Sequence, residues 1–207
     1  MDDHPATCFV VDDDASVRQS LSFLIESIGY RVETFDCADA FLAREPHGGI
    51  GCIISDVKMP GMNGLALQDI VERGDSPLPI IFITGHGDLP MGVAAMKKGA
   101  VDFLAKPFDD EDLTAAIALA LEKCRIARQT AAVAAAAQRR IETLSPREHE
   151  VLRHVISGRL NKQIAFDLGI TEHTVKIHRG RIMKKLAVDS LADLVRLAGK
   201  AGIAPAP

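Results

Sequence analysis

The chain has 207 residues, of which 47 % are hydrophobic, so it holds enough apolar material for one large or two small folded domains. Residues 1–125 carry 10 Lys and Arg against 21 Asp and Glu (net −11), whereas residues 126–207 carry 14 against 7 (net +7). This difference in charge favours two domains, one acidic and one basic. The phosphate backbone of nucleic acid would attract the basic domain. We expect a cytoplasmic protein without a membrane segment, because no apolar run approaches the roughly 18 residues that a span needs and the first residues are acidic, unlike a signal sequence.

Residues 1–123 alternate short apolar runs with helical patterns, which is typical of a parallel sheet covered by helices. We expect a doubly wound α/β domain of five strands and five helices, because right-handed crossovers place helices on both faces of such a sheet. The expected strands are residues 7–11, 31–35, 52–55, 80–83 and 101–104. The helices that the pattern locates are residues 16–28, which Gly29 would end through a positive φ, and residues 64–72, 89–98 and 109–124.

An alanine-rich segment, residues 124–143, follows this domain. Its helix propensity is high and its apolar surface is small, so it is predicted to be a helical linker. A frayed low-complexity tether is the alternative, since alanine tracts score well as helix without needing to be ordered.

Residues 144–207 show only helical patterns and are predicted to form an all-α domain of four helices. Ser145-Pro146-Arg147-Glu148 would cap the first helix, which Gly158 would end. Residues 161–168 and 171–186, joined by a short turn, then predict a helix-turn-helix, and a fourth helix begins near Ser190. Residues 201–207 contain two prolines and are expected to be a disordered tail.

Polar side chains close four of the expected strands. Asp12, Asp13 and Asp14 follow the first strand, Asp56 the third, Thr84 the fourth and Lys106 the fifth. Because the carboxyl ends of parallel strands meet at one edge of the sheet, these groups should converge, and carboxylates so placed suit Mg²⁺. A hydroxyl and an ammonium beside them suit phosphoryl transfer. The plainer interpretation of Asp12 to Asp14 is capping of the next helix, and Asp14 could have only that role.

Four spaced motifs make residues 6–122 resemble the receiver domain of two-component response regulators, in particular the FixJ group. They are Val10-Val11-Asp12-Asp13, Asp56-Val57-Lys58-Met59-Pro60-Gly61-Met62-Asn63-Gly64, Thr84-Gly85-His86-Gly87-Asp88 and Phe103-Leu104-Ala105-Lys106-Pro107-Phe108. The resemblance implies a flavodoxin-like strand order and phosphorylation of Asp56 by a sensor histidine kinase.

The same resemblance implies roles for single residues. Asp13 and Asp56, with Asp12 partly through water and the Lys58 carbonyl, would hold Mg²⁺, while Thr84 and Lys106 would bind the phosphoryl oxygens. Lys106 would be turned inward by a cis bond to Pro107. Phe103 matches an aromatic switch position, although an isolated phenylalanine is more often a core residue. Val93 and Lys97 are candidates for a dimer face, and Lys58 and His86 resemble positions that tune the phosphate lifetime.

Residues 143–200 resemble the LuxR-type four-helix DNA-binding domain. The motifs are Leu144-Ser145-Pro146-Arg147-Glu148, Asn161-Lys162-Gln163-Ile164-Ala165 and Thr171-Glu172-His173-Thr174-Val175-Lys176-Ile177-His178. Val175, Ile182 and Leu186 share one helical stripe and should face the core, which leaves a basic face to enter a major groove. The predicted base contacts are Glu172, His173, Lys176 and Arg179, and the predicted phosphate contacts are Asn161, Lys162, Arg181 and Lys184. The plainer interpretation is a solvated helix face, and Gly180 departs from relatives that place a lysine there.

These resemblances together imply a regulator of transcription, expected to be an activator, that is not an enzyme. Phosphorylation of Asp56 would promote homodimerisation and binding to a double-stranded DNA operator, with RNA polymerase as a further partner and Mg²⁺ as the cofactor. A phosphohydrolase with an aspartyl intermediate and a sigma-like adaptor are the alternatives. The first would turn over repeatedly, and the second would need RNA polymerase to bind a duplex.

The four cysteines are Cys8, Cys37, Cys52 and Cys124, and their spacing matches no metal motif. Cys8 and Cys52 fall within apolar runs, where a thiol packs as a small hydrophobic group. Free thiols in a reducing compartment are therefore expected.

Overall fold

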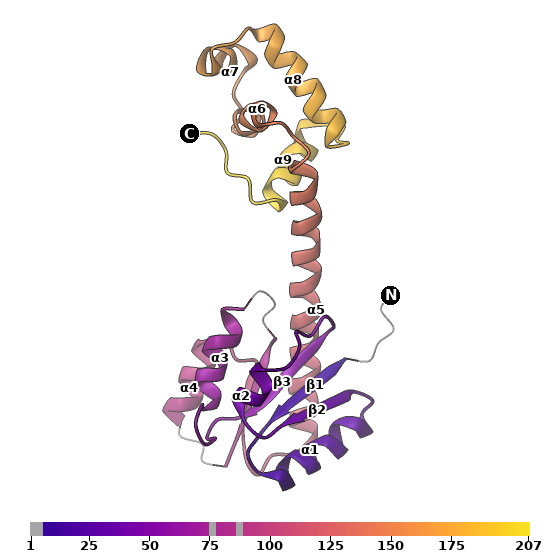
Figure 1. The fold of residues 1–207 in the computed structure, drawn as a ribbon, viewed down its shortest axis with the longest axis vertical. Coiled ribbons are helices and arrows are strands. Elements are labelled where there is room, and N and C mark those ends of the chain that lie inside the picture. The colour runs from indigo at the N-terminus through magenta and orange to yellow at the C-terminus, as the bar shows by residue number, and fades with distance from the viewer. Residues whose placement is uncertain (1–5, 75–77, 86–88) are drawn as a thin grey trace. The chain divides into compact units, whose positions relative to one another are not determined.

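The computed structural model describes residues 6–74, 78–85 and 89–207 (Figure 1). The chain divides into two compact units, Met1–Arg128 and Gln129–Pro207, and each is described by itself. The boundary falls within the segment 124–143 that the sequence assigns to a linker. Among the residues described, no helix combines the length and the apolar character that crossing a membrane requires.

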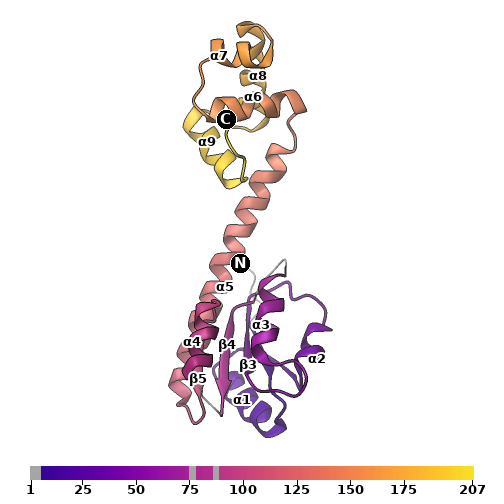
Figure 2. The same cartoon turned by 90° about the vertical axis from the view of Figure 1, so that its left-hand side faces the viewer.

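Unit 1 is built on a five-stranded parallel sheet in the order β2-β1-β3-β4-β5, which confirms the flavodoxin-like order. Strand β1 is paired on both sides, Cys8 facing Val32 of β2 and Cys52 of β3. The central strands are buried except at Asp56, because helices cover both faces of the sheet (Figure 2). The strands are β1 (Thr7–Val11), β2 (Arg31–Phe35), β3 (Gly51–Asp56), β4 (Ile80–Thr84) and β5 (Asp102–Ala105).

In the described part of unit 1, five helices accompany these strands. They are α1 (Ala15–Ser27), α2 (Ala38–Leu42), α3 (Gly64–Glu72), α4 (Leu89–Lys97) and α5 (Asp110–Ile141). One core cluster, around Ile25, Ile54 and Ile117, packs under α1 and α5, and a second, around Phe9 and Phe82, packs under α2 and α3. Gly29 follows α1 with a φ of 90°, as its position in the sequence predicts.

Helix α5 continues without a break from unit 1 into unit 2, so most of the alanine-rich segment is helical. Its last turns contribute Ala137 and Ile141 to the core of unit 2. The apolar surface of the segment is therefore small, but part of it is buried in the core of unit 2.

Unit 2 contains four further helices after α5. They are α6 (Pro146–Ile156), α7 (Asn161–Leu168), α8 (Glu172–Lys185) and α9 (Leu191–Lys200). Ser145 and Glu148 form the expected capping box at the start of α6. Gly169, with a φ of 63°, makes the tight turn between α7 and α8 and completes the helix-turn-helix.

Residues 201–207, expected to be disordered, instead lie along α6. The Ala206 amide donates to the Arg153 carbonyl at 3.0 Å, and the Arg153 Nε donates to the Ala204 carbonyl at 3.1 Å. Ile203 packs against the core of unit 2. Proline has no amide N–H to donate, but the two prolines do not prevent docking, because an extended chain needs few amide donors.

The cysteines are free, as expected. Cys8 and Cys52 lie side by side on β1 and β3, with their sulfur atoms 3.7 Å apart. Their hydrogen bond and burial raise the pKa of Cys52 well above its ordinary value. A thiol so placed stays protonated and behaves as a core residue.

Candidate functional site

The carboxyl ends of four neighbouring strands bring the predicted acidic site together. Asp12 directly follows β1, Asp56 ends β3, Thr84 ends β4 and Lys106 directly follows β5. Parallel strands leave the sheet in the same direction, so side chains from distant parts of the chain meet at one edge.

Three carboxylates form the centre of this site. One ligand oxygen from each of Asp12, Asp13 and Asp56 lies within 4.8 Å of the other two. Asp12 is fully buried, Asp56 is half-buried and Asp13 is exposed, so the cluster opens to solvent on one side. Such a set of hard oxygen atoms fits Mg²⁺, which binds through one or two carboxylates and keeps waters for exchange with a phosphate.

Lys106 is directed into this cluster. Its Nζ donates to Asp12 Oδ2 at 2.9 Å, and its side chain is 25 % exposed against 1 % for that of Asp12. The Lys106–Pro107 peptide bond is cis, as the resemblance implies, and the Lys106 amide donates to the Thr84 carbonyl at 2.8 Å. Thr84 is itself buried. The ammonium is thus held next to the carboxylates while part of it still reaches solvent.

Asp56 lies in a mixed electrostatic environment. Burial raises the pKa of its carboxyl group, the Lys106 ammonium opposes that rise, and the charge of Asp12 adds to it. The Val57 amide donates to Asp56 Oδ1 at 2.7 Å and fixes the carboxylate plane. A carboxylate that burial makes more basic is a better nucleophile, provided that a cation keeps it ionised.

Helix α3 approaches the site through a residue without a side chain. The Gly64 amide donates to the Val57 carbonyl at 3.0 Å, and a Cβ on Gly64 would lie 2.4 Å from the Asp56 carbonyl oxygen. Only glycine therefore allows α3 to begin so close to Asp56. Gly64 is the last residue of the motif that begins at Asp56, directly after Asn63, but the close approach that requires glycine there depends on tertiary structure.

Asp14 has the plainer role that the sequence left open. Its Oδ1 accepts from the Ser16 amide at 2.8 Å and from the Ser16 hydroxyl at 2.6 Å, and these bonds lower the pKa of Asp14. Asp14 is therefore the N-cap of α1, whereas Asp12 belongs to the site.

Phe103 is half-buried and its ring lies 6.4 Å from that of Phe82. A Cβ on Gly92 of α4 would come within 3.1 Å of the Phe103 ring, so the ring occupies space that a larger residue would fill. Val93 is 47 % exposed and Lys97 is also exposed on α4. Lys58 is exposed beside Asp56, and His86 lies outside the described residues.

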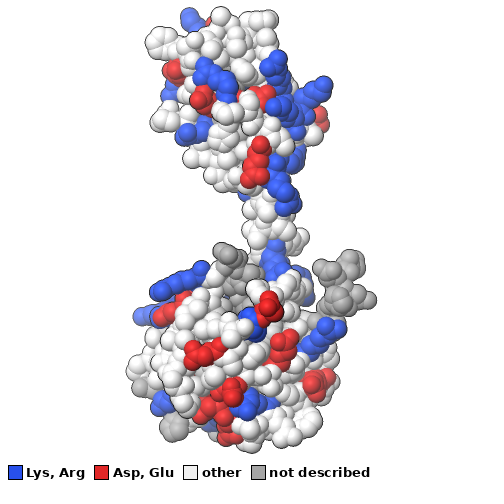
Figure 3. All heavy atoms as spheres, viewed as in Figure 1, with Lys and Arg blue, Asp and Glu red and all other residues white. Residues whose placement is uncertain are grey.

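The second candidate site is the exposed face of α7 and α8 in unit 2. Val175, Ile182 and Leu186 are buried, which confirms the predicted core stripe of α8. The predicted contacts that remain exposed are Lys162, Glu172, His173, Lys176, Arg181 and Lys184. Figure 3 shows Lys and Arg side chains gathered on unit 2, whereas Asp and Glu are spread over the visible face of unit 1.

Two of the predicted DNA contacts are bonded to each other. Arg179 Nη1 donates to Asn161 Oδ1 at 3.0 Å, and Arg179 is only partly exposed. Arg179 is thus less exposed than the other predicted base contacts, because its guanidinium reaches across to the start of α7, and its contact with bases stays a prediction. The bond joins the two helices of the helix-turn-helix.

Ile177 is a residue of this face that the sequence did not single out. It follows Lys176 on α8 and is 41 % exposed although it is a large apolar residue. An apolar side chain on a face otherwise rich in charge could have signalled contact with an apolar group of DNA, such as a thymine methyl.

Comparisons with known proteins match both units. Residues 8–118 match the family model described as response regulator receiver domain, and residues 142–198 match the model described as bacterial regulatory proteins, luxR family. The chain is 46 % identical to transcriptional regulatory protein FixJ of Bradyrhizobium diazoefficiens, over 94 % of this chain and 95 % of that protein. It is also 46 % identical to response regulator protein TodT of Pseudomonas putida, over 95 % of this chain and 87 % of that protein.

Solved structures give the same result. The response regulator StyR aligns with a TM-score of 0.78 and 48 % identity, over 95 % of this chain and 99 % of that one. Full-length FixJ from B. japonicum aligns with a TM-score of 0.57 and 46 % identity, over 95 % and 97 %. These likenesses extend over nearly the whole chain, so they apply to both units.

Proposed function

The chain belongs to the two-component response regulators that join a receiver domain to a LuxR-type DNA-binding domain, and on this premise we propose that a sensor histidine kinase phosphorylates it on Asp56. The observation that carries the proposal is the convergence of Asp12, Asp13 and Asp56 within 4.8 Å, with Lys106 bonded to Asp12. A receiver of this kind serves as a switch for its own attached domain, so one phosphoryl group per chain is the expected stoichiometry.

The transfer reaction requires little covalent chemistry from the protein. An oxygen of Asp56 attacks the phosphorus of a phosphohistidine, the P–N bond breaks, and an acyl phosphate forms. When bound, Mg²⁺ supplies the positive charge that neutralises the incoming phosphoryl group, and Asp12, Asp13, Asp56 and the Lys58 carbonyl would hold it. Thr84 and Lys106 are the donors for the phosphoryl oxygens because they close the neighbouring strands.

The structural effect of phosphorylation would then be transmitted through the residues that contact the phosphoryl oxygens. Thr84 would move toward the phosphoryl group, and Phe103 would turn into the space that it vacates. Phe103 already packs against Gly92 of α4, so a change in the ring would reach α4 and its exposed residues Val93 and Lys97. We place the dimer face there.

The helix-turn-helix is the part that binds DNA. Glu172, His173 and Lys176 lie at the start of α8, the end of a recognition helix that normally meets the bases. Lys162, Arg181 and Lys184 would contact phosphates. Arg179 would contact a base and Asn161 a phosphate, and the hydrogen bond between them would hold both side chains in position. Dimerisation would bring two such faces onto one operator and activate transcription by RNA polymerase.

The regulation can be tested on the full-length chain. We expect light scattering to show a monomer that becomes a dimer after incubation with a small phosphodonor and Mg²⁺, together with tighter binding to duplexes selected from a random pool. A phosphorylated protein that stays monomeric and binds these duplexes no better would contradict the proposed switch. Duplex binding that requires RNA polymerase would favour the adaptor instead.

The two kinds of DNA contact predict different defects. Lys184→Ala should weaken binding to all duplexes alike and reduce the slope of log K against log salt by about 1, because it removes one phosphate contact. Lys176→Ala should instead cost about 1–3 kcal/mol at one base position and relax the preference there. Fluorescence anisotropy over a salt series measures both, with Lys200→Ala, exposed at the end of α9, as the control. Exchanged patterns for the two variants would refute the assignment.

A further inference from the structure

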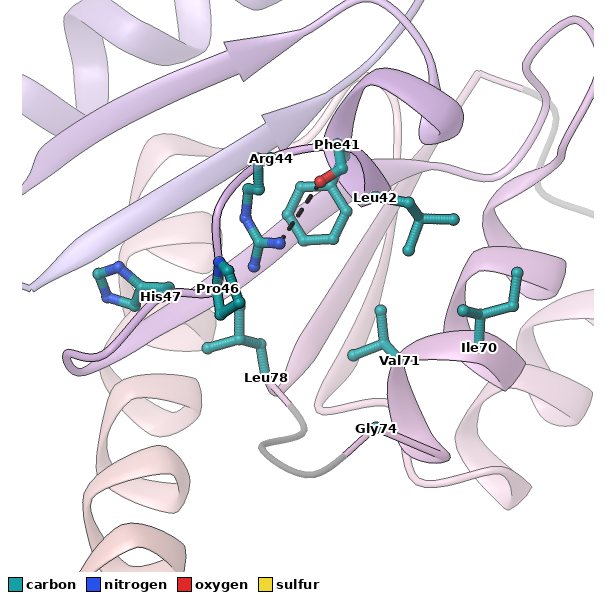
Figure 4. A pocket seen from close by; sticks show the side chains of 9 residues that line it. All are labelled: Phe41, Leu42, Arg44, Pro46, His47, Ile70, Val71, Gly74 and Leu78. Atoms are coloured by element: carbon teal, nitrogen blue, oxygen red, sulfur yellow. Dashed lines mark hydrogen bonds between the residues drawn. The ribbon is translucent and has the colours of Figure 1, made fainter.

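A second hollow in unit 1 lies at the opposite end of the sheet from Asp56. Its volume is about 360 Å³, and it opens between α2, the last turns of α3 and the segments that enter β3 and β4 (Figure 4). Since Pro46 precedes β3 and Leu78 precedes β4, the hollow belongs to the amino ends of the strands. It is therefore separate from the acidic site. The lining is Phe41, Leu42, Arg44, Pro46, His47, Ile70, Val71, Gly74 and Leu78.

Arg44 is the one arginine in this otherwise mainly apolar lining. Its guanidinium carbon lies 3.9 Å from the centre of the Phe41 ring and 4.7 Å from that of Phe9. The Arg44 Nη1 donates to the Phe41 carbonyl at a long 3.4 Å, and the buried Nε has no hydrogen-bond partner in the part of the chain that the structure describes. Burial lowers the pKa of Arg44, and Glu33 only partly opposes this effect.

Placing this half-buried guanidinium in an apolar hollow is costly, because its charge loses part of its hydration and gains only the long bond to the Phe41 carbonyl, while the Nε gains no acceptor. The guanidinium carbon lies over the Phe41 and Phe9 rings, and these cation–π contacts return part of this cost. The rings do not occupy the edge of the guanidinium, where the N–H donors point outward as a fixed fork. A carboxylate can accept from that fork with its two oxygens, and the apolar walls of the hollow would contact the apolar part of the same ligand.

The polar groups of the hollow also limit the charge of the ligand. Among the lining residues that the structure describes, the other titratable one is His47, whose Nε2 lies 3.2 Å from the Ile50 carbonyl and whose ring packs against Phe9. The Nε2 of His47 is thus already engaged, and among the described lining residues Arg44 is left to bind one carboxylate. We propose that this hollow binds a small free monocarboxylate with a compact branched or cyclic apolar body.

Isothermal titration of the full-length chain with 3-methylbutanoate tests the proposal. We expect saturable binding to wild type, and binding at least about tenfold weaker for the neutral 3-methylbutanamide, because a charge-assisted pair is lost. Formate, which has the charge without the apolar body, should bind more weakly as well. Equal affinity for the acid and the amide, or no saturable binding of the acid, would overturn the proposal.

Substitutions of Arg44 test whether the ligand binds at this residue. Arg44→Gln should weaken 3-methylbutanoate binding at least about tenfold, whereas Arg31→Gln, an exposed arginine on β2, should leave it unchanged. Circular dichroism and phosphorylation at Asp56 check that the variant is folded. If Arg44→Gln does not fold, Arg44→Lys replaces it, since it keeps the charge but removes the fork and should show an intermediate loss. Unchanged affinity in the folded Arg44 variant would also refute the proposal.

Discussion

Full-length protein incubated with a small phosphodonor and Mg²⁺ should gain one phosphoryl group, and Asp56→Asn should gain none. The expected loss is complete because the amide has no ionised oxygen to attack phosphorus, and neighbouring carboxylates are poorly placed to replace it. Asp12 is fully buried and bonded to Lys106, and Asp13 is exposed. Intact mass spectrometry measures the result directly.

Asp14→Asn is the matched control for this experiment. Asp14 lies two residues from Asp12 but caps α1, and asparagine caps helices about as well as aspartate. The control should therefore be phosphorylated like wild type. If neither wild type nor the control gains phosphate, the site is not a phosphoacceptor; if Asp56→Asn gains phosphate as wild type does, another residue is the nucleophile.

The acidic site could be predicted from sequence because its members are fixed by one rule. Asp12, Asp56, Thr84 and Lys106 each end or directly follow a strand, and parallel strands bring such positions together whatever the intervening chain does. The capping role of Asp14 was also accessible, since it depends on residues two and three positions away. Most residues of this site can thus be predicted from local sequence patterns and from the positions of the strand ends.

Features that depend on contacts between distant elements were missed. The bond between Arg179 and Asn161 spans 18 residues, and helical periodicity alone places Arg179 on the outer face. The short helix α2, five residues long, has too few turns to show a period, and the sequence gives no sign that the guanidinium of Arg44 lies over two aromatic rings. The close approach of Gly64 to Asp56 is of the same kind.

The tail was misjudged for a related reason. Proline and alanine give residues 201–207 the composition of a disordered end, yet Arg153 and Arg159 of unit 2 donate to its carbonyl groups. Carbonyl acceptors are present in every residue, so composition says nothing about whether donors elsewhere will meet them. The docking can be seen only once α6 is in place.

Replacing Glu148 should give the largest loss of stability that we expect in unit 2. Glu148 is 3 % exposed, accepts from Lys185 Nζ at 2.7 Å and from the Ser145 amide at 2.8 Å, and joins α6 to α8. The bond from Lys185 and then that from Ser145 lower the pKa of Glu148 from 4.5 to about 2. Because the Lys185 side chain is 42 % exposed and solvent screens the pair, we expect Glu148→Gln to cost about 2 kcal/mol at pH 7.

The pH dependence of this loss follows from the direction of the pKa shift. A carboxyl group with a lowered pKa in the folded state stabilises the fold above its unfolded pKa near 4.5, and this contribution disappears as the pH falls toward 2. Hydrogen exchange of α6 and α8 amides should therefore be about thirtyfold faster in Glu148→Gln than in wild type at pH 7, and the ratio should shrink toward one as acid is added.

Glu150→Gln supplies the comparison. Glu150 is on the same helix and pairs with Arg147 three residues before it, but both side chains are exposed, so its loss should change stability by less than about 0.5 kcal/mol. A ratio for Glu148→Gln that stays constant with pH would mean that the variant acts through packing and not through charge. Equal effects of the two substitutions would mean that burial of Glu148 does not strengthen its pair, and the link from α6 to α8 would then have to rest on the apolar core alone.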